Sequence, residues 1–486
     1  MTEIDSLTAS DAVAQAAAVR RGDVAPVDLV EAAIRQIERL EPEIGALVHT
    51  RFEEARKEAA SANLSAPFAG VPLILKDSLS STQNGIPYFA GNRVLKERPY
   101  ISPADSPIGA RLRKAGFITV AVSKTPELGF STTTQPAAFG PTCNPWDLRY
   151  SVGGSSGGSA AAVMARMAPV ATGGDSGGSI RIPASFCGTI GLKPTRGLVQ
   201  LPEPNINDRM HAFVLTRTVR DTRALLGVLA GEDARCLFTS GARPKHPTNG
   251  GPPDLPRLRV GIARTMGGVE AHPDCHRAVD ATIPVLERLG FSVADTAPSI
   301  FAANDALWGG DHDLLTVGAI GALGHLETVA GRAIRQDEVE PFLWETAHPA
   351  AGMPELEGYL LAAKRRRSWA VSAMGWWNDY HLLVLPTVCE PPVLIEARAK
   401  ETIAQTTLTE MRQMAFSFPF NLTGQPSISL PLHSTAEGMP VGVQLVADMG
   451  ADDLLLTVAE RLEMMLPWNH REPPTMRRPS SAPSNE

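Results

Sequence analysis

Two glycine-rich stretches of the sequence place serine residues beside runs of backbone N–H groups. The first, SVGGSSGGSAAAV, starts at Ser151 and leads into an alanine-rich segment, and the second, GGDSGGSIRIP, starts at Gly173. Unpaired N–H groups at such turns can hold the oxyanion of an acyl-transfer reaction, each donor contributing about 3–4 kcal/mol. A serine hydroxyl beside them is a candidate nucleophile, but it needs a base. The chemistry therefore depends on which serine reacts and what activates it.

Two known serine-hydrolase patterns match parts of this region. Gly-Asp-Ser-Gly-Gly around Ser176 is spelled like the nucleophile loop of a chymotrypsin-type protease, whose base histidine precedes the serine. Only His49 precedes Ser176, and it lies in a segment predicted to be helical. Gly-x-Ser-x-Gly occurs twice, as in an α/β-hydrolase elbow, and His381 and His433 follow it. Neither pattern explains two such loops close together, which favours a mechanism that uses both.

A lysine can act as the base in such a mechanism. The run Val71–Leu75 is apolar, too short for a helix and bounded by Gly70, so it predicts a buried strand. Lys76 ends this run. Burial disfavours the charged form and lowers a lysine pKa by up to several units. We therefore predict that Lys76 activates a serine of the two loops.

The stretches GVPLILKD, NPWDLRYSVGGSSGGSAAAV and GGDSGGSIRIPASFCGTIGLKPTRG together closely resemble the amidase signature family of amide hydrolases. The resemblance covers nearly the whole chain and includes SISLPL and GMPVGVQLVA near its C-terminal end. It implies an α/β fold with a large mixed central β-sheet covered by helices on both faces. Within the family, the chain is similar to stand-alone bacterial amidases, including the nylon cyclic-dimer hydrolase type and carbamate-hydrolysing enzymes.

The resemblance also implies a Ser-cisSer-Lys triad. Ser179, directly before Ile-Arg, corresponds to the nucleophile, and Lys76 corresponds to the base. Ser155 corresponds to the bridging serine, which follows a cis peptide bond after Gly154. An acyl-enzyme forms on Ser179 and is hydrolysed by water, with no metal or cofactor. The oxyanion hole is implied to consist of the backbone N–H groups of Ser176, Gly177, Gly178 and Ser179.

Four further residues are expected to support the site. Ser156 is expected to form hydrogen bonds within it. Asp175 and Arg181 flank the nucleophile loop, and we expect a salt bridge between them that stiffens the loop. Phe130 precedes the catalytic blocks at a place where relatives carry part of the acyl pocket, so we expect it to contact the substrate.

Alternating helices and strands must position these groups. APVDLVEAAIRQIERLEP has helical spacing and predicts a helix from Pro26 to about Pro42, and VHTRFEEARKEAASA, from Val48, predicts a second helix. SAAAVMARMAPVATGGD predicts a helix and then a strand that enters the nucleophile loop. RLRVGIAR, HPDCHRAVDATIPVLERLG and FSVADTAP predict a strand–helix–strand unit, and SISLPLH and GMPVGVQLVAD predict a strand pair. This alternation is typical of an α/β fold.

We expect a single domain over residues 1–470. Its core motifs lie in residues 70–200, and a variable region at about 300–360 is expected to form part of the substrate funnel. Residues 236–256, rich in proline and glycine, are predicted to be a surface connection. Residues 471–486 are predicted to be a disordered tail.

Composition narrows the classes of function. The chain has 486 residues, 43% hydrophobic and 20% charged, and a net charge of −7, which gives no electrostatic basis for binding nucleic acid or an anionic membrane. No apolar run is long enough for a transmembrane helix. The 5 cysteines, without a C-x-x-C motif, and an N-terminus without an apolar run indicate a cytoplasmic protein. HPDCH, from His272, is predicted to begin a helix rather than to bind a metal.

Together these features predict a serine hydrolase that cleaves C–N bonds of small-molecule amides. Aryl and aliphatic amides, carbamates (urethanes), esters and nylon-type oligoamides are candidate substrates, and a homodimer is left open. Two alternatives stay open as well. One is the glutaminase subunit of a tRNA-dependent amidotransferase, although KRRRSWAVSAMG stands where that branch carries an RIMLG helix. The other is a catalytically inactive binding subunit, which the intact Lys76, Ser155 and Ser179 disfavour.

Overall fold

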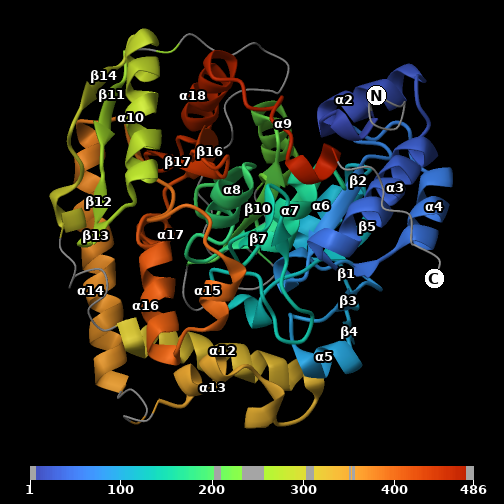
Figure 1. Ribbon diagram of the computed structural model, residues 1–486, viewed down its shortest axis with the longest axis horizontal. Coiled ribbons are helices and arrows are strands. Elements are labelled where there is room, and N and C mark those ends of the chain that lie inside the picture. Colours follow the sequence, from blue (N-terminus) through green and yellow to red (C-terminus); the bar gives the residue numbers. More distant parts are fainter. Residues whose placement is uncertain are drawn as a thin grey trace.

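The computed structural model describes residues 7–201, 209–231, 255, 257–302, 311–349, 352 and 356–477. An eleven-stranded sheet that mixes parallel and antiparallel pairs runs through its centre, with helices around it (Figure 1). The predicted α/β fold with a large mixed sheet is confirmed. In sheet order, the strands are β1 (Leu47–Thr50), β5 (Ile118–Ser123), β2 (Pro72–Lys76), β8 (Val170–Asp175), β10 (His211–Thr216), β9 (Ile190–Lys193), β16 (Ser427–Ser434), β17 (Pro440–Ala447), β15 (Leu382–Pro386), β11 (Arg259–Ile262) and β14 (Ser292–Ala294).

The strands that carry the candidate base and the nucleophile loop are neighbours. Strand β2 pairs in parallel with β5 on one side and with β8 on the other. All five residues of β2 are buried, as expected for a strand with both faces covered. Because the carboxyl ends of parallel strands meet at one edge of a sheet, Lys76 and Asp175 end their strands at the same edge.

Helix α7 (Gly157–Met164) follows directly after Ser155 and Ser156, and every residue in it is buried. Its small side chains let it lie close to the sheet. A Cβ atom on Gly158 would stand 2.5 Å from the carbonyl oxygen of Lys124 and 2.6 Å from that of Ala46. Close packing therefore requires glycine at position 158, independently of any chemistry of the loop.

The first predicted helix is longer than expected. Helix α3 (Pro26–Ile44) begins at Pro26 but continues through Pro42 for two residues. It ends at Gly45, whose φ of 61° places it in the left-handed region that glycine adopts readily. Glycine, rather than proline, marks the end of this helix.

The second predicted helix is wrong at its start. Residues 47–50 form the edge strand β1, which pairs antiparallel with β5, and helix α4 (Phe52–Ala60) begins only afterwards. His49 therefore lies in a strand. The pairing with a strand about 70 residues away decides the conformation here, rather than the helical pattern that follows in the sequence.

Two helices close one end of the molecule. Helices α12 (Asp311–Ala330) and α13 (Pro341–Ala347) pack on each other along the lower edge in Figure 1. They enclose an apolar cluster, separate from the main core, that also includes Tyr88 and Leu95. This described part of the variable region therefore forms a layer of its own.

Other predicted units are also present. Strands β11 and β14 pair in parallel around helix α10 (Pro273–Arg288), and β16 pairs antiparallel with β17. The remaining helices include α2 (Ala12–Arg21), α5 (Arg93–Glu97), α6 (Pro107–Lys114), α8 (Arg181–Cys187), α9 (Val219–Leu229), α14 (Leu356–Met374), α15 (Ile395–Ala399), α16 (Ile403–Met414), α17 (Phe418–Thr423) and α18 (Asp452–Met465). Short two-stranded ladders join β3 (Pro87–Tyr88) to β4 (Tyr100–Ile101), β6 (Cys143–Asn144) to β7 (Asp147–Ser151) and β12 (Thr265–Met266) to β13 (Val269–Glu270).

The start of the predicted tail is attached to the domain. Residues 474–477 form a 3₁₀ turn, and the Thr475 hydroxyl donates a 2.8 Å hydrogen bond to the Pro145 carbonyl oxygen. Residues 478–486, like all of the predicted connection 236–256 except 255, lie outside the described residues. Within the described ranges, no helix is both long and apolar enough to cross a membrane.

Candidate active site

Lys76 and the two serines of the first loop form a buried hydrogen-bonded group. The Lys76 Nζ atom donates to Ser155 Oγ at 2.7 Å and to Ser156 Oγ at 2.9 Å. All three side chains are buried. The Gly154–Ser155 peptide bond is cis, as the family resemblance implies. The structure thus brings together a lysine and a serine that are 79 residues apart in the sequence.

Burial shifts the pKa of Lys76 toward neutrality. Loss of solvent lowers this pKa, whereas the carboxylates of Asp175 and Asp77 raise it, and the net result is a pKa of about 7. Asp77 is itself fixed, because it accepts hydrogen bonds from the N–H groups of Phe89 at 2.9 Å and Gly91 at 3.1 Å. Near pH 7, a large fraction of Lys76 is therefore uncharged and able to take a proton.

Ser156 joins the first loop to the second. Its hydroxyl lies 3.3 Å from both the N–H and the carbonyl oxygen of Gly174 in β8. Its own N–H donates a 3.1 Å hydrogen bond to the carbonyl oxygen of Ser179. Ser156 thus links Lys76 to both loops by hydrogen bonds.

Ser179 is more accessible than the groups behind it. It is half-buried, whereas Ser155 and Lys76 are buried, so a substrate can reach Ser179 first. In the described part of the chain, no hydrogen bond joins the hydroxyls of Ser155 and Ser179. Catalytic contacts of this kind often tighten only when substrate is bound.

The loop from Ser176 to Ser179 offers fewer free donors than expected. The N–H of Gly178 donates a 2.8 Å hydrogen bond to Asp175 Oδ1, so it is not free to bind an oxyanion. Among the described residues, the N–H groups of Ser176, Gly177 and Ser179 have no protein acceptor. The oxyanion hole predicted from the sequence therefore loses one of its donors, the N–H of Gly178.

Of the residues that the structure describes, no base forms a hydrogen bond with the hydroxyl of Ser176. It donates to the sulfur atom of Met210 at 2.9 Å. Of the histidines that the rejected patterns require, His49 lies in the edge strand β1, and His381 accepts a hydrogen bond from the N–H of Arg259. In the described part of the chain, the Gly-Asp-Ser-Gly-Gly sequence around Ser176 is therefore not accompanied by the histidine that a chymotrypsin-type protease requires.

The predicted salt bridge between Asp175 and Arg181 is present and fully buried. Arg181 donates from Nε and Nη2 to the two carboxylate oxygens of Asp175, each at 2.9 Å. Burial raises the pKa of Asp175, but the charge and hydrogen bonds of Arg181 outweigh it and hold this pKa below its ordinary value. The Asp175 carboxylate therefore stays ionised, and its contact with Arg181 fixes both ends of the nucleophile loop.

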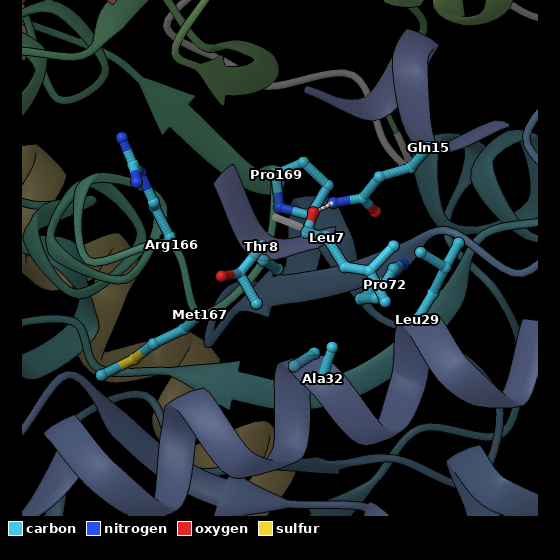
Figure 2. A pocket seen from close by; sticks show the side chains of 11 residues that line it. Leu7, Thr8, Gln15, Leu29, Ala32, Pro72, Arg166, Met167 and Pro169 are labelled. Atoms are coloured by element: carbon cyan, nitrogen blue, oxygen red, sulfur yellow. Dashed lines mark hydrogen bonds between the residues drawn. The ribbon is translucent and has the colours of Figure 1, made fainter. Parts of the chain in front are cut away.

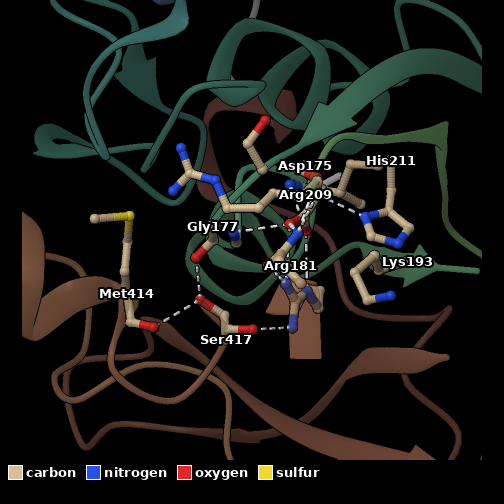
Figure 3. Close-up of polar contacts among 12 residues, drawn as sticks. Asp175, Gly177, Arg181, Lys193, Arg209, His211, Met414 and Ser417 are labelled. Atoms are coloured by element: carbon tan, nitrogen blue, oxygen red, sulfur yellow. Dashed lines mark hydrogen bonds and ion pairs between the residues drawn. The ribbon is translucent and has the colours of Figure 1, made fainter. Parts of the chain in front are cut away.

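The C-terminal part of the chain completes this cluster (Figure 3). Arg181 also donates to the carbonyl oxygen of Ser417 at 2.7 Å and to Gln444 Oε1 at 2.8 Å. The Ser417 hydroxyl donates to the carbonyl oxygen of Gly177 at 2.6 Å, and Asn421 Nδ2 donates to Asp175 Oδ1 at 2.8 Å. These contacts attach the loop and the start of α8 to the C-terminal part of the chain.

Sequence reasoning missed these C-terminal partners. Ser417 and Asn421 belong to the stretch AFSFPFNLTG, where they are isolated polar residues in an apolar run. Both are fully buried. Buried polar side chains need hydrogen-bond partners, so isolated polar residues in an apolar run could have indicated that this stretch binds another part of the chain.

Phe130 lies between the bridging serine and the closing helices. Its ring packs against Phe342 of α13 with centroids 6.0 Å apart, and a Cβ atom on Gly318 of α12 would stand 3.8 Å from it. The preceding residue, Gly129, faces the Ser155 hydroxyl, which a Cβ atom there would approach to 3.4 Å. Phe130 thus follows a residue that neighbours Ser155, and it packs against α12 and α13.

A small cavity lies at the other end of strand β2. It is lined by residues that include Gln15, Pro72 and Met167 (Figure 2). Pro72 begins β2 and Lys76 ends it, so the cavity is separated from the site by the length of the strand. No hydrogen-bond partner among the described residues reaches the buried Gln15 Oε1 atom.

The HPDCH stretch forms a helix start, as predicted. The His272 side chain caps α10 by accepting a hydrogen bond from the N–H of Asp274. Across the residues that the structure describes, no cluster of three or more His, Cys, Asp or Glu side chains is arranged to hold a metal ion.

Comparison with known proteins agrees with this geometry. The family model for amidases matches residues 28–456. The chain is 38% identical to the 6-aminohexanoate-cyclic-dimer hydrolase of Pseudomonas sp. (strain NK87), over 95% of this chain and 96% of that protein. It is 29% identical to an acylamidase of Rhodococcus erythropolis, again over 95% and 96%. A solved structure of 6-aminohexanoate cyclic dimer hydrolase complexed with substrate matches with a TM-score of 0.91 at 36% identity, covering 96% of this chain and 99% of that one.

Proposed function

Because the chain belongs to the amidase signature family, we propose that it hydrolyses small-molecule amides through Ser179, Ser155 and Lys76. The observation that carries this proposal is the 2.7 Å contact between Lys76 Nζ and Ser155 Oγ in a buried site. A lysine with a pKa of about 7 is a suitable base near neutral pH.

The proposed reaction begins with two proton transfers. Uncharged Lys76 takes the proton of Ser155, and Ser155 takes that of Ser179 as the Ser179 Oγ atom bonds to the amide carbonyl carbon. The N–H groups of Ser176 and Gly177 hold the resulting oxyanion. The C–N bond then breaks, and the relay returns a proton to the leaving nitrogen. Water hydrolyses the acyl-enzyme by the same relay, so one difficult step is divided into two.

The substrate class follows from the relatives and from the pocket wall. We propose that cyclic or linear oligoamides of the nylon type and simple aryl or aliphatic amides are substrates, because 6-aminohexanoate-cyclic-dimer hydrolases and an acylamidase are similar along the whole chain. The apolar wall of Phe130 and Phe342 supports an acyl group with an apolar chain. Carbamates and esters can pass through the same acyl-enzyme and are further candidates. We also propose that the enzyme acts in the cytoplasm.

Replacing each serine of the second loop by alanine tests which of the two is the nucleophile. We expect Ser179→Ala to lower kcat for p-nitroanilides by roughly a thousandfold or more, because the attacking oxygen is removed. Ser176→Ala should keep kcat within about threefold, because the backbone donor remains and only the contact with Met210 is lost. The reverse pattern would assign the nucleophile to Ser176.

A substrate panel separates this proposal from its alternatives. The purified chain is assayed with p-nitroanilides, the cyclic dimer of 6-aminohexanoate, carbamates, esters and glutamine, and labelled with a fluorophosphonate. Hydrolysis of glutamine alone would indicate a subunit of a tRNA-dependent amidotransferase. No turnover together with no labelling would indicate an inactive binding subunit.

A further inference from the structure

We propose that Glu410, in the C-terminal helix α16, is a positioning residue for the bridging serine Ser155. It acts by holding residues 131–133 against Gly154, the residue on the other side of the cis peptide bond. This inference rests on the proposed function, because it assigns a role relative to the relay from Lys76 to Ser179.

Glu410 binds the segment before the first catalytic loop with both carboxylate oxygens. The Ser131 hydroxyl donates to Oε1 at 2.8 Å, and the N–H of Thr132 donates to Oε2 at 2.6 Å. Glu410 lies 278 residues after Thr132 in the chain and is only 5% exposed. A buried carboxylate that receives two hydrogen bonds from one short segment fixes the position of that segment.

This segment is packed directly on the residue before Ser155. A Cβ atom on Gly154 would stand 2.7 Å from both the N and the O atom of Thr133 and 2.8 Å from the carbonyl oxygen of Ser131. The Thr134 hydroxyl donates to the carbonyl oxygen of Gly153 at 2.8 Å. Any shift of residues 131–133 is therefore passed to Gly154 and then to Ser155.

The position of Glu410 is itself fixed by an arginine. Arg398 Nη2 lies 2.5 Å from Glu410 Oε1, and both side chains are 6% exposed. Arg398 Nη1 binds Glu401 at 3.0 Å, and Glu401 accepts a hydrogen bond from Thr409. Glu401 thus shares the arginine but does not contact the Ser131–Thr133 segment, which makes it a matched control.

The end of the same helix contacts the nucleophile loop. Met414 is one turn after Glu410, and its sulfur atom would stand 2.6 Å from a Cβ atom on Gly177. The Ser417 hydroxyl, just beyond the helix, donates to the carbonyl oxygen of Gly177. Helix α16 therefore touches the segment beside Ser155 and the loop that carries Ser179, and it sets the spacing between the two serines.

The test compares kcat and KM for a p-nitroanilide in Glu410→Ala, Glu410→Gln and Glu401→Ala. We expect Glu410→Ala to lower kcat by about ten- to a hundredfold with KM within about threefold, because small misplacements of reacting groups reduce rates strongly. Glu410→Gln keeps one acceptor oxygen and should lose less. Glu401→Ala should stay within about twofold of the parent, since its contacts do not reach the site.

A double-mutant cycle separates positioning from a general loss of folding. Ser131→Ala removes the hydrogen bond to Glu410, together with the 3.2 Å hydrogen bond that the Ser131 hydroxyl accepts from the N–H of Thr133, and should lower kcat by itself. In the Glu410→Ala background its effect should be smaller than in the parent, because the contact between Ser131 and Glu410 is already absent. Losses that multiply, or a Glu410→Ala enzyme with the parent kcat, would overturn the inference. Should Glu410→Ala not fold, an unchanged kcat in Ser131→Ala would overturn it.

Labelling by a fluorophosphonate distinguishes failure of this inference from failure of the proposed function. The labelling rate of Ser179 should fall in Glu410→Ala in parallel with kcat. If Ser179→Ala is still labelled at the parent rate, the nucleophile assignment is wrong. If Ser179→Ala is not labelled but Glu410→Ala is labelled at the parent rate, only the role of Glu410 is wrong.

Discussion

Lys76 ends a buried strand among hydroxyl groups, and its environment acts on its charge in two directions. Burial lowers its pKa, whereas Asp175 and Asp77 raise it. With a pKa of about 7, the side chain is charged below neutral pH and uncharged above it. Only the uncharged amine has the lone pair that the proposed relay through Ser155 requires.

The pH dependence of the reaction tests this base. We expect kcat/KM of the parent enzyme to rise as the pH increases through about 7 and then to level off, because deprotonation creates the active base. Lys76→Ala should lower kcat/KM by about 10²- to 10⁴-fold, lose this rise and recover in part at high pH. The measurement is a pH–rate profile with a p-nitroanilide. A near-parental Lys76→Ala enzyme, or a flat parental profile across neutral pH, would contradict the assignment.

On the scale of elements, the nucleophile loop is held between the end of β8, the start of α8 and the C-terminal helix α17. The buried pair of Asp175 and Arg181 is the centre of this contact, and Asn421 of α17 binds both members. The ion pair has no exposed atoms to share its charge with solvent. Removing one partner therefore leaves the other charge buried.

Arg181→Met tests the contribution of this pair to stability. We expect it to lower the free energy of unfolding by about 3–5 kcal/mol, because the buried Asp175 carboxylate loses its paired charge. Arg149→Met is a suitable control, since Arg149 pairs with Asp147 while 75% exposed, and it should change stability by less than about 1 kcal/mol. Urea denaturation followed by fluorescence measures both. Equal effects of the two substitutions would refute the structural importance of the buried pair.

Local patterns in the sequence were enough to predict some of these elements but not others. The strand ending at Lys76, the two glycine loops and the strand entering the second loop each have a signal within about ten residues. Strand β1 was missed because its partner β5 is distant in the chain. The hydrogen bond that occupies the Gly178 N–H could not be predicted, because it depends on the conformation of the Asp175 side chain within the loop.

At the scale of the whole molecule, the chain forms two halves of one sheet. The first six strands in the sheet come from residues 47–216 and the last five from residues 259–447, and they meet where β9 pairs with β16. The pairing of β9 with β16 brings Ser417 and Asn421 close to the nucleophile loop. No local pattern encodes this junction, which is why the C-terminal partners of the site were not predicted.

The layer of α12 and α13 should control which acyl groups fit. We expect Phe342→Ala to lower kcat/KM for short-chain acyl p-nitroanilides by about tenfold and to lower it less, or raise it, for longer chains, because space opens beside Phe130. Leu361→Ala on α14, at a side chain 44% exposed, is the control and should leave the chain-length profile unchanged. A profile that keeps its shape in Phe342→Ala would place the acyl group elsewhere.

The contact between Arg181 and Gln444 also has a consequence for the order of events during protein synthesis. The two residues are 263 positions apart. At about 5–20 residues per second, a ribosome takes about 13 to 50 s to proceed from one to the other. For that period, the nascent chain contains Lys76, Ser155 and Ser179 but lacks the C-terminal segments that enclose them. The growing polypeptide should therefore become an active hydrolase only when its final strands have left the ribosome.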